Sequence, residues 1–433
     1  MSVRSVDTVV VGAGIIGTCI AERLQYEGTQ VLLLDREGVG GGCSGGNAGH
    51  FATDVVLPLA NPQTLLALPK MLFNPLGPLR LRGRYLPRML PWLLRFAVAA
   101  LPAPARASTQ ALRALNSRSI KSFERLLDRT GLQDLMTQRG AITLYESAAS
   151  RDRHRHTVQL LRDYGVVVQE HSGDELRELE PALTAAVDSG LLFPNTAHTV
   201  NPLRLTRELA AYFSAAGGEI ITGSAGEVQS LYPGGDTGTE VELGLATGEC
   251  LRAQRVVVAA GAYSGHLLRS LGLCVPLETE RGYHLMLPTM RQGLIQSGLS
   301  RPVTSHERSF VMTPMEEGLR LAGTVELAGL DAAPDYRRAD ILLDHARHLL
   351  REVNPAGATR WLGRRPSLPD SLPVIGPAPG APQLMLAFGH QHLGLTQAAV
   401  TAELVVDMMM RRKPKFDPAP YRVERFWGVK RCM

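Results

Sequence analysis

The chain has 433 residues, of which 45% are hydrophobic and 20% charged. This composition excludes a disordered or collagen-like protein, and the length predicts two domains or one large domain with an insertion. The formal net charge of +5 is unevenly spread, because residues 55–123 contain ten Lys and Arg and no Asp or Glu. That segment carries +10, so the rest of the chain is slightly acidic.

The cysteines give no sign of a metal site, because they lie far apart without a Cys-x-x-Cys pair: Cys19, Cys43, Cys250, Cys274 and Cys432. An odd, scattered set argues against a disulfide framework or a zinc site and fits a reducing compartment. The N-terminal apolar run leads directly into a glycine motif and lacks the features of a signal peptide. No segment reaches the roughly 18 to 20 apolar residues of a spanning helix. We therefore expect a cytoplasmic protein without bound metal.

The first thirty-five residues predict a β-α-β unit. An apolar run at 6–11 leads into the motif GAGIIG, then a helical stretch, then a second apolar run that ends in Asp35. The glycines permit a tight turn, close approach of the backbone to a pyrophosphate, and close packing of helix on strand. The pyrophosphate would lie at the helix N-terminus, and the acid would accept hydrogen bonds from a ribose. The predicted cofactor-binding residues of this unit are Gly12, Ala13, Gly14, Ile16, Gly17 and Asp35.

A loop of small residues follows at 36–50 and favours FAD over NAD. Such a loop can wrap a pyrophosphate and bring backbone amides to a flavin ring. The alternative is a flexible linker, which would hardly need Asn47 and His50. The predicted cofactor-binding residues of the loop are Arg36, Cys43, Ser44, Asn47, Ala48 and Gly49.

Further elements follow along the chain. Asn201-Pro202 supplies an N-cap and a first-turn proline for a helix that ends near residue 217. Residues 255–259 are typical of a buried parallel strand that ends in a tight turn at Ala260-Gly261. The remaining predicted elements are strands at 140–145, 219–221, 227–228, 276–287, 309–315 and 319–326, and helices at 174–179 and 340–353.

The motif GAGIIG, the acid at 35 and a loop ending in Asn-Ala-Gly together resemble the D-amino acid oxidase superfamily of FAD enzymes. Near the C-terminus, the segment 361–376 resembles the family's Gly-x-Arg-Pro…Pro-Asp…Pro-x-x-Gly pattern. The segment 389–396 resembles the family's glycine-histidine loop, which opens the last helix. Bacterial D-amino acid dehydrogenases, including the D-hydroxyproline dehydrogenase branch, look most similar.

The resemblance implies an α/β fold with an α+β second domain: a Rossmann-type FAD-binding domain and an antiparallel-sheet substrate domain, both discontinuous in sequence. We assign residues 1–54, 186–275 and 355–433 to the FAD-binding domain. The substrate domain is assigned 106–185 and 276–354, and 55–105 is an insertion.

The resemblance also implies further cofactor contacts. The backbone at Val228 would meet the adenine, and the amides that open the last helix would stabilise negative charge on the pyrimidine edge of the flavin. No cysteine matches the covalent flavin attachment of sarcosine oxidases, so we expect non-covalent FAD. The residues implied are Val228, Ala260, Gly261, Gly363, Gly394, Leu395 and Thr396.

Arg365 is the predicted partner of the substrate carboxylate, because a planar guanidinium matches a carboxylate with two hydrogen bonds. The alternative for Arg365 is a salt bridge with an acid nearby such as Asp370. Arg364 would point the opposite way in an extended segment, and we assign it to structure. Tyr283 resembles the family's Gly-Tyr, whose hydroxyl helps hold the carboxylate; aromatic packing is the alternative.

Two histidines flank the expected flavin. His50 and His392 would shape the pocket or assist proton loss from the substrate amine, and hydrogen-bonded structural roles are the alternative. The chain departs from the family at Pro314, where many members carry an arginine. Either Arg365 works with Tyr283 alone, or another base such as Arg308 supplies a second contact, which makes a cyclic or N-substituted amino acid plausible.

The acid-free insertion predicts a membrane-interface helix. Pro87, Pro91 and Pro102 bracket a short helix at 92–101, in which Arg88 and Arg95 fall on one line beside Trp92 and the other faces are apolar. Such a helix is typical of an interfacial anchor. A substrate lid or a docking face for a partner subunit is the alternative; a nucleic-acid surface is disfavoured because no binding module is recognised.

The sequence therefore predicts FAD-dependent oxidative deamination of a D-amino acid, including D-proline-like and D-hydroxyproline-like substrates. Hydride would pass to the flavin and electrons to a quinone or other acceptor, at the inner face of the cell membrane. The alternatives are a soluble glycine- or sarcosine-type oxidase that uses oxygen, and a flavoprotein subunit of a multi-subunit amino acid dehydrogenase. No nucleic-acid partner is expected.

Overall fold

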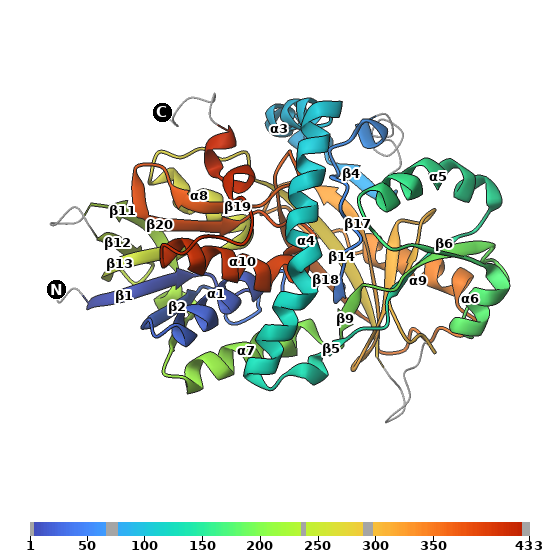
Figure 1. The fold of residues 1–433 in the computed structure, drawn as a ribbon, viewed down its shortest axis with the longest axis horizontal. Coiled ribbons are helices and arrows are strands. Elements are labelled where there is room, and N and C mark those ends of the chain that lie inside the picture. The colour runs from blue at the N-terminus through green and yellow to red at the C-terminus, as the bar shows by residue number, and fades with distance from the viewer. Residues whose placement is uncertain (1–3, 66–76, 235–239, 289–297, 427–433) are drawn as a thin grey trace.

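The computed structural model of the protein describes residues 4–65, 77–234, 240–288 and 298–426, and its strands form two large sheets side by side. In Figure 1 the first sheet lies on the left and the second on the right. In this view the long helix α4 (Pro102–Thr130) crosses in front of the boundary between them. This arrangement confirms the predicted α/β fold.

The first sheet has eight strands and carries the β-α-β unit. Its parallel part runs in the order β10-β2-β1-β13, with β20 beside the last residues of β13, while β11, β12 and β19 pair antiparallel. The strands are β1 (Arg4–Val11), β2 (Val31–Asp35), β10 (Glu219–Thr222), β11 (Val228–Pro233), β12 (Val241–Leu245), β13 (Cys250–Val258), β19 (Val374–Ala378) and β20 (Ala381–Phe388).

Helices cover both faces of this sheet. α1 (Ile15–Tyr26), α7 (Pro202–Ala215) and α10 (Gly394–Met409) pack on one face, and α8 (Ser264–Arg269) lies against β11 on the other. The predicted cap of α7 is confirmed, since Asn201 Oδ1 accepts a hydrogen bond from the backbone N–H of Arg204. α4 packs its apolar side on α10 and ends at Gly131, whose φ of 72° is the left-handed conformation that favours glycine.

The second sheet has nine strands and is mainly antiparallel. Its order is β18-β14-β17-β16-β15-β6-β8-β7, and β4 adds to β17. The strands are β4 (Leu79–Leu81), β6 (Ala141–Tyr145), β7 (Gln169–Ser172), β8 (Ser189–Phe193), β14 (Glu278–Pro288), β15 (Val303–Ser305), β16 (Phe310–Met315), β17 (Gly318–Leu327) and β18 (Thr359–Ser367).

Smaller elements complete the fold. The helices α5 (Ala148–Asp163), α6 (Gly173–Leu179) and α9 (Arg337–Leu349) accompany the second sheet. A three-stranded sheet joins β3 (His50–Phe51), β9 (Ala197–Thr199) and β5 (Met136–Thr137). Short 3₁₀ turns lie at Gly83–Tyr85, Gln133–Leu135, Gly223–Gly226, Gly261–Tyr263, Ala419–Tyr421 and Val423–Phe426.

Strand pairing departs from the expected domain ranges at two places. β8 lies within 186–275 and β18 within 355–433, ranges assigned to the FAD-binding domain, yet both pair in the second sheet. The helix α4, expected with the substrate domain, packs on α10 of the first sheet. A short apolar run predicts a strand but does not say which sheet the strand joins. The division into two domains stays a prediction.

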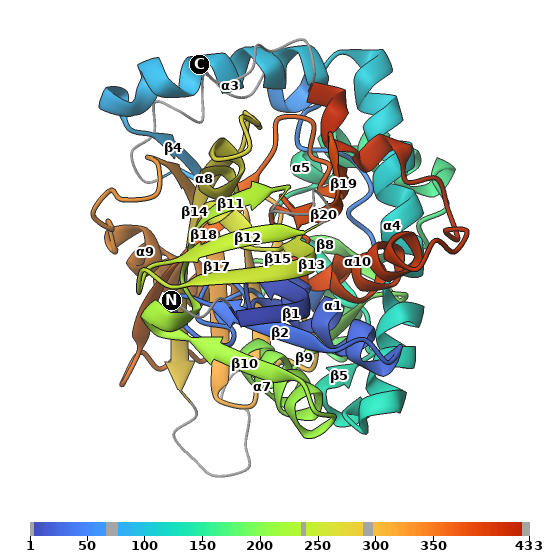
Figure 2. The ribbon, with the colours of Figure 1, turned by 90° about the vertical axis from the view of Figure 1, so that its left-hand side faces the viewer.

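The insertion folds differently from the sequence expectation. Its helix α3 (Leu86–Ala99) begins six residues early and contains Pro91, which costs one helical hydrogen bond, and Pro102 opens α4. Trp92 does not border an exposed basic stripe: it is 8% exposed and its ring stacks on that of Phe96 inside a small core. Figure 2 shows α3 along the outer edge of the molecule.

The outer side of α3 is apolar. Its large side chains are 44–62% exposed and recur every three or four residues: Leu86, Leu90, Leu94, Val98 and, just beyond the helix, Leu101. Of the segment's basic residues, Arg84 and Arg88 are exposed, whereas Arg82 Nε lies 2.6 Å from the buried Glu326 and Arg80 pairs with Asp335. Within the described ranges, no helix is long and apolar enough to cross a bilayer.

The cysteines differ in state. Cys19, Cys43 and Cys250 carry free thiols, whereas Cys274 is disulfide-bonded. The sequence spacing does not predict this bond, because distance along the chain says nothing of distance in the fold. Cys432 lies outside the described residues.

Candidate active site

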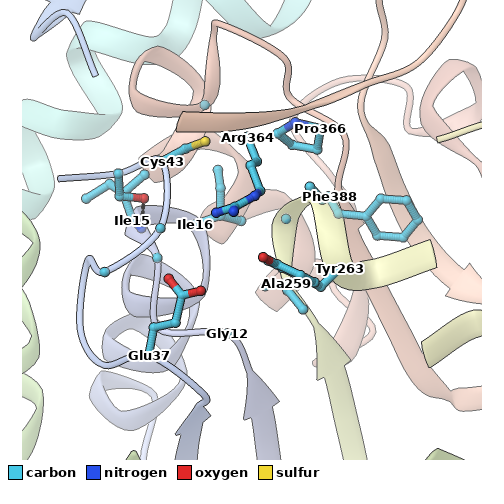
Figure 3. A pocket seen from close by; sticks show the side chains of 18 of the residues that line it. Gly12, Ile15, Ile16, Glu37, Cys43, Ala259, Tyr263, Arg364, Pro366 and Phe388 are labelled. Carbon is cyan, nitrogen blue, oxygen red and sulfur yellow. Dashed lines mark hydrogen bonds between the residues drawn. The ribbon is translucent and has the colours of Figure 1, made fainter. Parts of the chain in front are cut away.

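A cavity of about 430 Å³ opens at the carboxyl ends of β1, β2 and β13, between the first sheet and β18. Figure 3 shows it surrounded by side chains from separate parts of the chain, among them Cys43, Tyr263 and Arg364. Ligands of open α/β sheets bind at this edge.

The glycine motif forms the narrow end of the cavity. Gly12 has a φ of +109°, and a Cβ there would lie 2.4 Å from the carbonyl oxygen of Ala259. A Cβ on Gly17 would lie 1.8 Å from the carbonyl oxygen of Gly12, so α1 can lie this close to the turn after β1 only because Gly17 lacks a side chain. Gly14 and the first turn of α1 face the cavity, where helix amides can meet a phosphate.

Asp35 lines the cavity, and its carboxylate already accepts three hydrogen bonds from backbone N–H groups. Oδ2 accepts from the backbone N–H of Ala13 at 2.7 Å, and Oδ1 accepts from those of Glu37 and Gly38 at 2.7 and 2.9 Å. A carboxylate has about four acceptor positions, so one remains for a ribose hydroxyl. The neighbouring Arg36 lies over the ring of Tyr263, 4.4 Å from its centroid.

The small-residue loop is fixed by hydrogen bonds and is no flexible linker. Ser44 Oγ accepts from the backbone N–H of Ile15 at 2.8 Å, and Asn47 Nδ2 donates to the carbonyl of Ser44 at 2.6 Å. Arg320, on β17, donates to the carbonyl of Asn47 at 2.7 Å. Burial lowers the pKa of Arg320 to about 10. Sequence reasoning missed this arginine, because nothing near residue 320 points to a loop at residue 47.

Arg365 faces the cavity from β18. Its cross-strand partner on β14 is Glu280, and a Cβ on Gly282, two residues further along the same face, would lie 2.5 Å from the guanidinium carbon, so the side chain lies over that glycine. Within the described chain Arg365 makes no hydrogen bond or ion pair, and Asp370 is bound instead by Arg425 at 2.6 Å. A salt bridge with Asp370 is therefore not formed, and the acid opposite Arg365 in register is the buried Glu280 of β14, whose Oε1 accepts from Ser367 Oγ at 2.7 Å. Arg364 also lines the cavity, and its Nε donates to the carbonyl of Leu330 at 2.9 Å.

Tyr283 points away from the cavity, because successive residues of a strand face opposite sides of the sheet. Gly282 and His284 take the cavity side; His284 stacks on Trp361 with ring centroids 4.8 Å apart. Tyr283 is 1% exposed and its hydroxyl donates to Glu326 at 2.7 Å. Arg308 is also engaged elsewhere, in a two-point ion pair with Glu146. Neither residue lies in the cavity lining.

Of the two predicted histidines, the structure brings His392 into the lining and leaves His50 outside it. Burial, with the nearby Arg365, lowers the pKa of His392 to about 4, so the ring is neutral near pH 7. Burial lowers the pKa of His50 to about 4 as well. His50 Nε2 lies 3.9 Å from an oxygen of Asp54. His390, which was not predicted, fixes the loop by bonding Thr401 at 3.0 Å.

Most predicted residues thus meet at one place. Those in the lining are Gly12, Gly14, Ile16, Asp35, Arg36, Cys43, Ser44, Asn47, Ala48, Val228, Ala260, Gly261, Gly363, Gly394, Leu395, Arg365 and His392. Ala13, Gly17, Gly49, Thr396, Tyr283 and His50 lie outside it. The buried Thr396 holds the chain just after the loop, since its Oγ1 accepts a hydrogen bond from the backbone N–H of Ala52 at 3.0 Å. Sequence reasoning assigned no role to the lining residue Trp361, although it begins the recognised segment.

The residues present fit a dinucleotide. Bare glycine backbone, a helix N-terminus and a ribose-facing acid lie at one end, and the start of α10 closes the other, with Gly394 and Leu395 in the lining. A Rossmann-type cradle that shares its cavity with an antiparallel sheet defines the class as a dinucleotide-dependent oxidoreductase with the substrate wall on a second sheet.

The chain belongs to the DAO family of FAD-dependent oxidoreductases, which it matches over residues 7–408. The family resemblance and the FAD cofactor are thereby confirmed. A D-amino-acid oxidase of Bradyrhizobium diazoefficiens is 34% identical over 424 residues, covering 96% of this chain and 98% of that protein. D-amino acid dehydrogenase 2 of Ralstonia nicotianae is 34% identical over 428 residues, covering 96% and 99%.

Solved structures share the fold. Glycine oxidase from Geobacillus kaustophilus superimposes with a TM-score of 0.72 at 24% identity, covering 98% of this chain and 99% of that one. L-proline dehydrogenase from P. horikoshii gives a TM-score of 0.69 at 17% identity, covering 98% of both chains.

Proposed function

We propose that the protein oxidises a D-amino acid at the carbon that bears the amine. The observation that carries the proposal is the unpaired guanidinium of Arg365, held over Gly282 inside the dinucleotide cavity. A D-amino-acid oxidase and a D-amino acid dehydrogenase at 34% identity over nearly the whole chain support the same substrate class.

Bound FAD, held without a covalent bond, supplies the acceptor for the hydride that leaves the substrate α-carbon. The protein binds and orients the substrate: Arg365 holds the carboxylate with two charge-assisted hydrogen bonds. His392, whose pKa is lowered to about 4, is neutral near pH 7 and can accept a hydrogen bond from the amine, while the proton that the amine must lose before hydride transfer passes to water. A substrate with a primary amine becomes an imine, which water converts to a 2-oxo acid and ammonia; a proline-like substrate becomes a cyclic imine, which releases no ammonia.

The substrate wall supports a compact or cyclic amino acid such as a D-proline-like or D-hydroxyproline-like one. No arginine stands at residue 314, and Arg308 is bound to Glu146, so neither supplies a second cation at the carboxylate. Trp361, stacked on His284, lines the cavity together with Arg365.

An anaerobic screen tests the proposal. The FAD-bound enzyme is mixed with single D- and L-amino acids, and loss of the oxidised flavin absorbance is followed. We expect D-amino acids to bleach the flavin and their L-enantiomers not to. Bleaching by glycine or N-methylglycine with hydrogen peroxide formed in air would favour the oxidase alternative; no bleaching by any amino acid would contradict the proposal.

The proposal includes a quinone or similar acceptor and a contact between α3 and the inner face of the cell membrane. The support is the row of exposed leucines on α3, with Arg84 and Arg88 exposed beside it and no acid in residues 55–123. Apolar side chains at this spacing with flanking basic residues are typical of an interfacial helix. β4 pairs with β17, and Arg82 bonds Glu326. Both contacts favour a fixed surface for this segment rather than a moving substrate lid.

Sedimentation with vesicles tests this contact. The protein should pellet with vesicles that contain phosphatidylglycerol, because each leucine withdrawn from water contributes about 1.5–3 kcal/mol and each basic residue about 1 kcal/mol. The double change Leu90→Glu/Leu94→Glu should lower vesicle binding by about 100-fold or more. Val167→Glu, at an exposed apolar residue elsewhere, is the matched control. Unchanged pelleting of the double variant would exclude α3 as the contact.

A further inference from the structure

A second cavity, of about 370 Å³, lies between α4 and α10 and shares no lining residue with the cofactor cavity. Three segments border it: the middle of α4, the later turns of α10, and residues 415–416. It is open to solvent on one side, where the side chains of Arg125 and Lys415 are about half exposed. The function derived above makes no use of this cavity.

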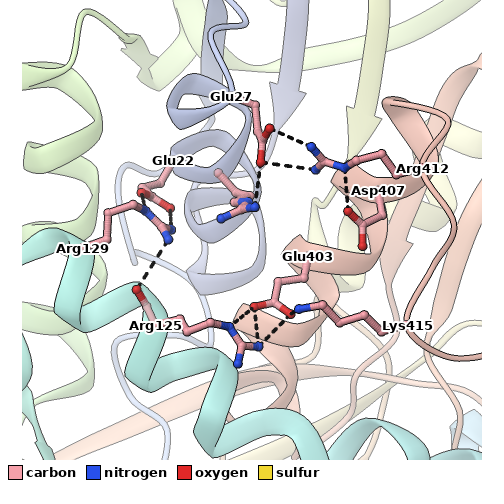
Figure 4. Close-up of polar contacts among 9 residues, drawn as sticks. Glu22, Glu27, Arg125, Arg129, Glu403, Asp407, Arg412 and Lys415 are labelled. Atoms are coloured by element: carbon pink, nitrogen blue, oxygen red, sulfur yellow. Dashed lines mark hydrogen bonds and ion pairs between the residues drawn. The ribbon is translucent and has the colours of Figure 1, made fainter.

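The lining carries more positive than negative charge. Its four basic residues are Arg118, Lys121, Arg125 and Lys415, and its two acidic residues are Glu403 and Asp407. Figure 4 shows that Arg125 and Lys415 converge on Glu403. Arg125 Nη2 lies 2.7 Å from Glu403 Oε1, and Lys415 Nζ lies 3.0 Å from Glu403 Oε2. Asp407 is bound by Arg412 at 2.9 Å. Both acids are therefore already compensated.

Two cations of the lining remain uncompensated. Neither Arg118 nor Lys121 has a carboxylate partner among the residues that the structure describes. Arg118 donates from Nη1 to the carbonyl of Ala114 at 2.8 Å and to Ser117 Oγ at 3.4 Å. A guanidinium has five donors, so several remain.

The other part of the lining is apolar. Val400 and Leu404 of α10 are 1% and 2% exposed. Phe416 forms a wall, and the guanidinium of Arg118 lies 5.2 Å from its ring centroid. An aromatic ring under an arginine restrains the guanidinium and leaves its edge available for an anion.

We propose that this cavity binds a small organic anion with an apolar part, such as a carboxylate on a branched or aromatic chain. Arg118 and Lys121 hold the anionic group, and Val400, Leu404 and Phe416 contact the apolar part. The site lies on α10, whose first residues Gly394 and Leu395 line the cofactor cavity, so a ligand here contacts the same helix as the cofactor.

Calorimetric titration of the FAD-bound protein with 4-methylpentanoate tests the site. This probe has no amine and is not a substrate. We expect two equivalents per chain: one that alters the flavin absorbance, at Arg365, and one that is spectrally silent. Arg118→Gln/Lys121→Gln should lose the silent equivalent alone. Phe416→Ala keeps every charge and should weaken the silent equivalent about tenfold.

Arg106→Gln/Arg113→Gln removes the same charge from exposed positions of α4 outside the cavity and should keep both equivalents. Absence of the silent equivalent in the unchanged protein, or its survival in Arg118→Gln/Lys121→Gln, would overturn the proposal. Equal silent binding of the neutral 4-methylpentanamide would also overturn it. Loss of the spectral equivalent alone would count against the proposed function and leave the second site standing.

Discussion

Replacing Arg365 with glutamine is expected to lower kcat/KM for the amino acid substrate by about 10²–10⁴-fold. The expected loss corresponds to two charge-assisted hydrogen bonds of about 1.5–3 kcal/mol each. Steady-state kinetics with an artificial electron acceptor measures the effect, and the flavin absorbance of the purified variant shows whether FAD stays bound. We expect full FAD content, because Arg365 rests on Gly282 of the substrate wall.

Two further variants make this result specific. Arg365→Lys keeps the charge but loses the planar fork, and should recover about tenfold in kcat/KM relative to the glutamine variant. Arg360→Gln removes an arginine from the same strand, where Arg360 pairs with Asp340 on the exposed side, and should leave kcat/KM unchanged. An equal loss in both glutamine variants, or none in Arg365→Gln, would show that Arg365 does not hold the substrate.

Replacing Glu326 with glutamine is expected to lower the free energy of unfolding by about 3–5 kcal/mol. Glu326 is fully buried; it accepts from Arg82 Nε at 2.6 Å and from the Tyr283 hydroxyl at 2.7 Å, and Arg281 Nη1 lies 3.3 Å away. Arg281 is itself fully buried, and its guanidinium makes no hydrogen bond within the described residues. The glutamine variant would leave that charge buried without compensation. Denaturant titration followed by circular dichroism measures the change.

The control for Glu326 is Asp152→Asn, which breaks an exposed pair with Arg155 and should cost no more than about 1 kcal/mol. Arg281→Met/Glu326→Leu removes both buried charges and should recover part of the lost stability, because an apolar pair needs no compensation. A loss in Glu326→Gln no larger than in Asp152→Asn would contradict the role assigned to the glutamate.

The cofactor end of the site could be predicted from the sequence because its geometry is local. Gly12, Gly14 and Asp35 lie within one β-α-β unit, where spacing along the chain fixes position in space. Arg365 could be predicted because its motif is also contiguous. Arg320 could not, since it supports Asn47 across 273 residues of chain and no local pattern marks that contact.

The side of a strand or helix that faces the site or the core was harder to predict than the position of that strand or helix in the sequence. The strands predicted at 276–287, 309–315 and 319–326 correspond to β14, β16 and β17. The side of β14 that faces the cavity could not be predicted, so Tyr283 was expected to contact the substrate, whereas its neighbour Gly282 is the residue that lies under Arg365. In the insertion, aromatic and aliphatic residues surround the helix on all sides, so the sequence alone could not show that Trp92 packs inward and Leu94 outward.

The two faces of β14 also limit how this enzyme can be engineered. One face carries Gly282 under Arg365, and the other carries Arg281 and Tyr283 around Glu326. Substitutions can change one face at a time. A one-residue insertion or deletion upstream of Gly282 would exchange the faces, turning the buried ionic cluster toward the cofactor and removing the support of Arg365. Libraries that retarget the substrate should therefore keep the length of this strand constant.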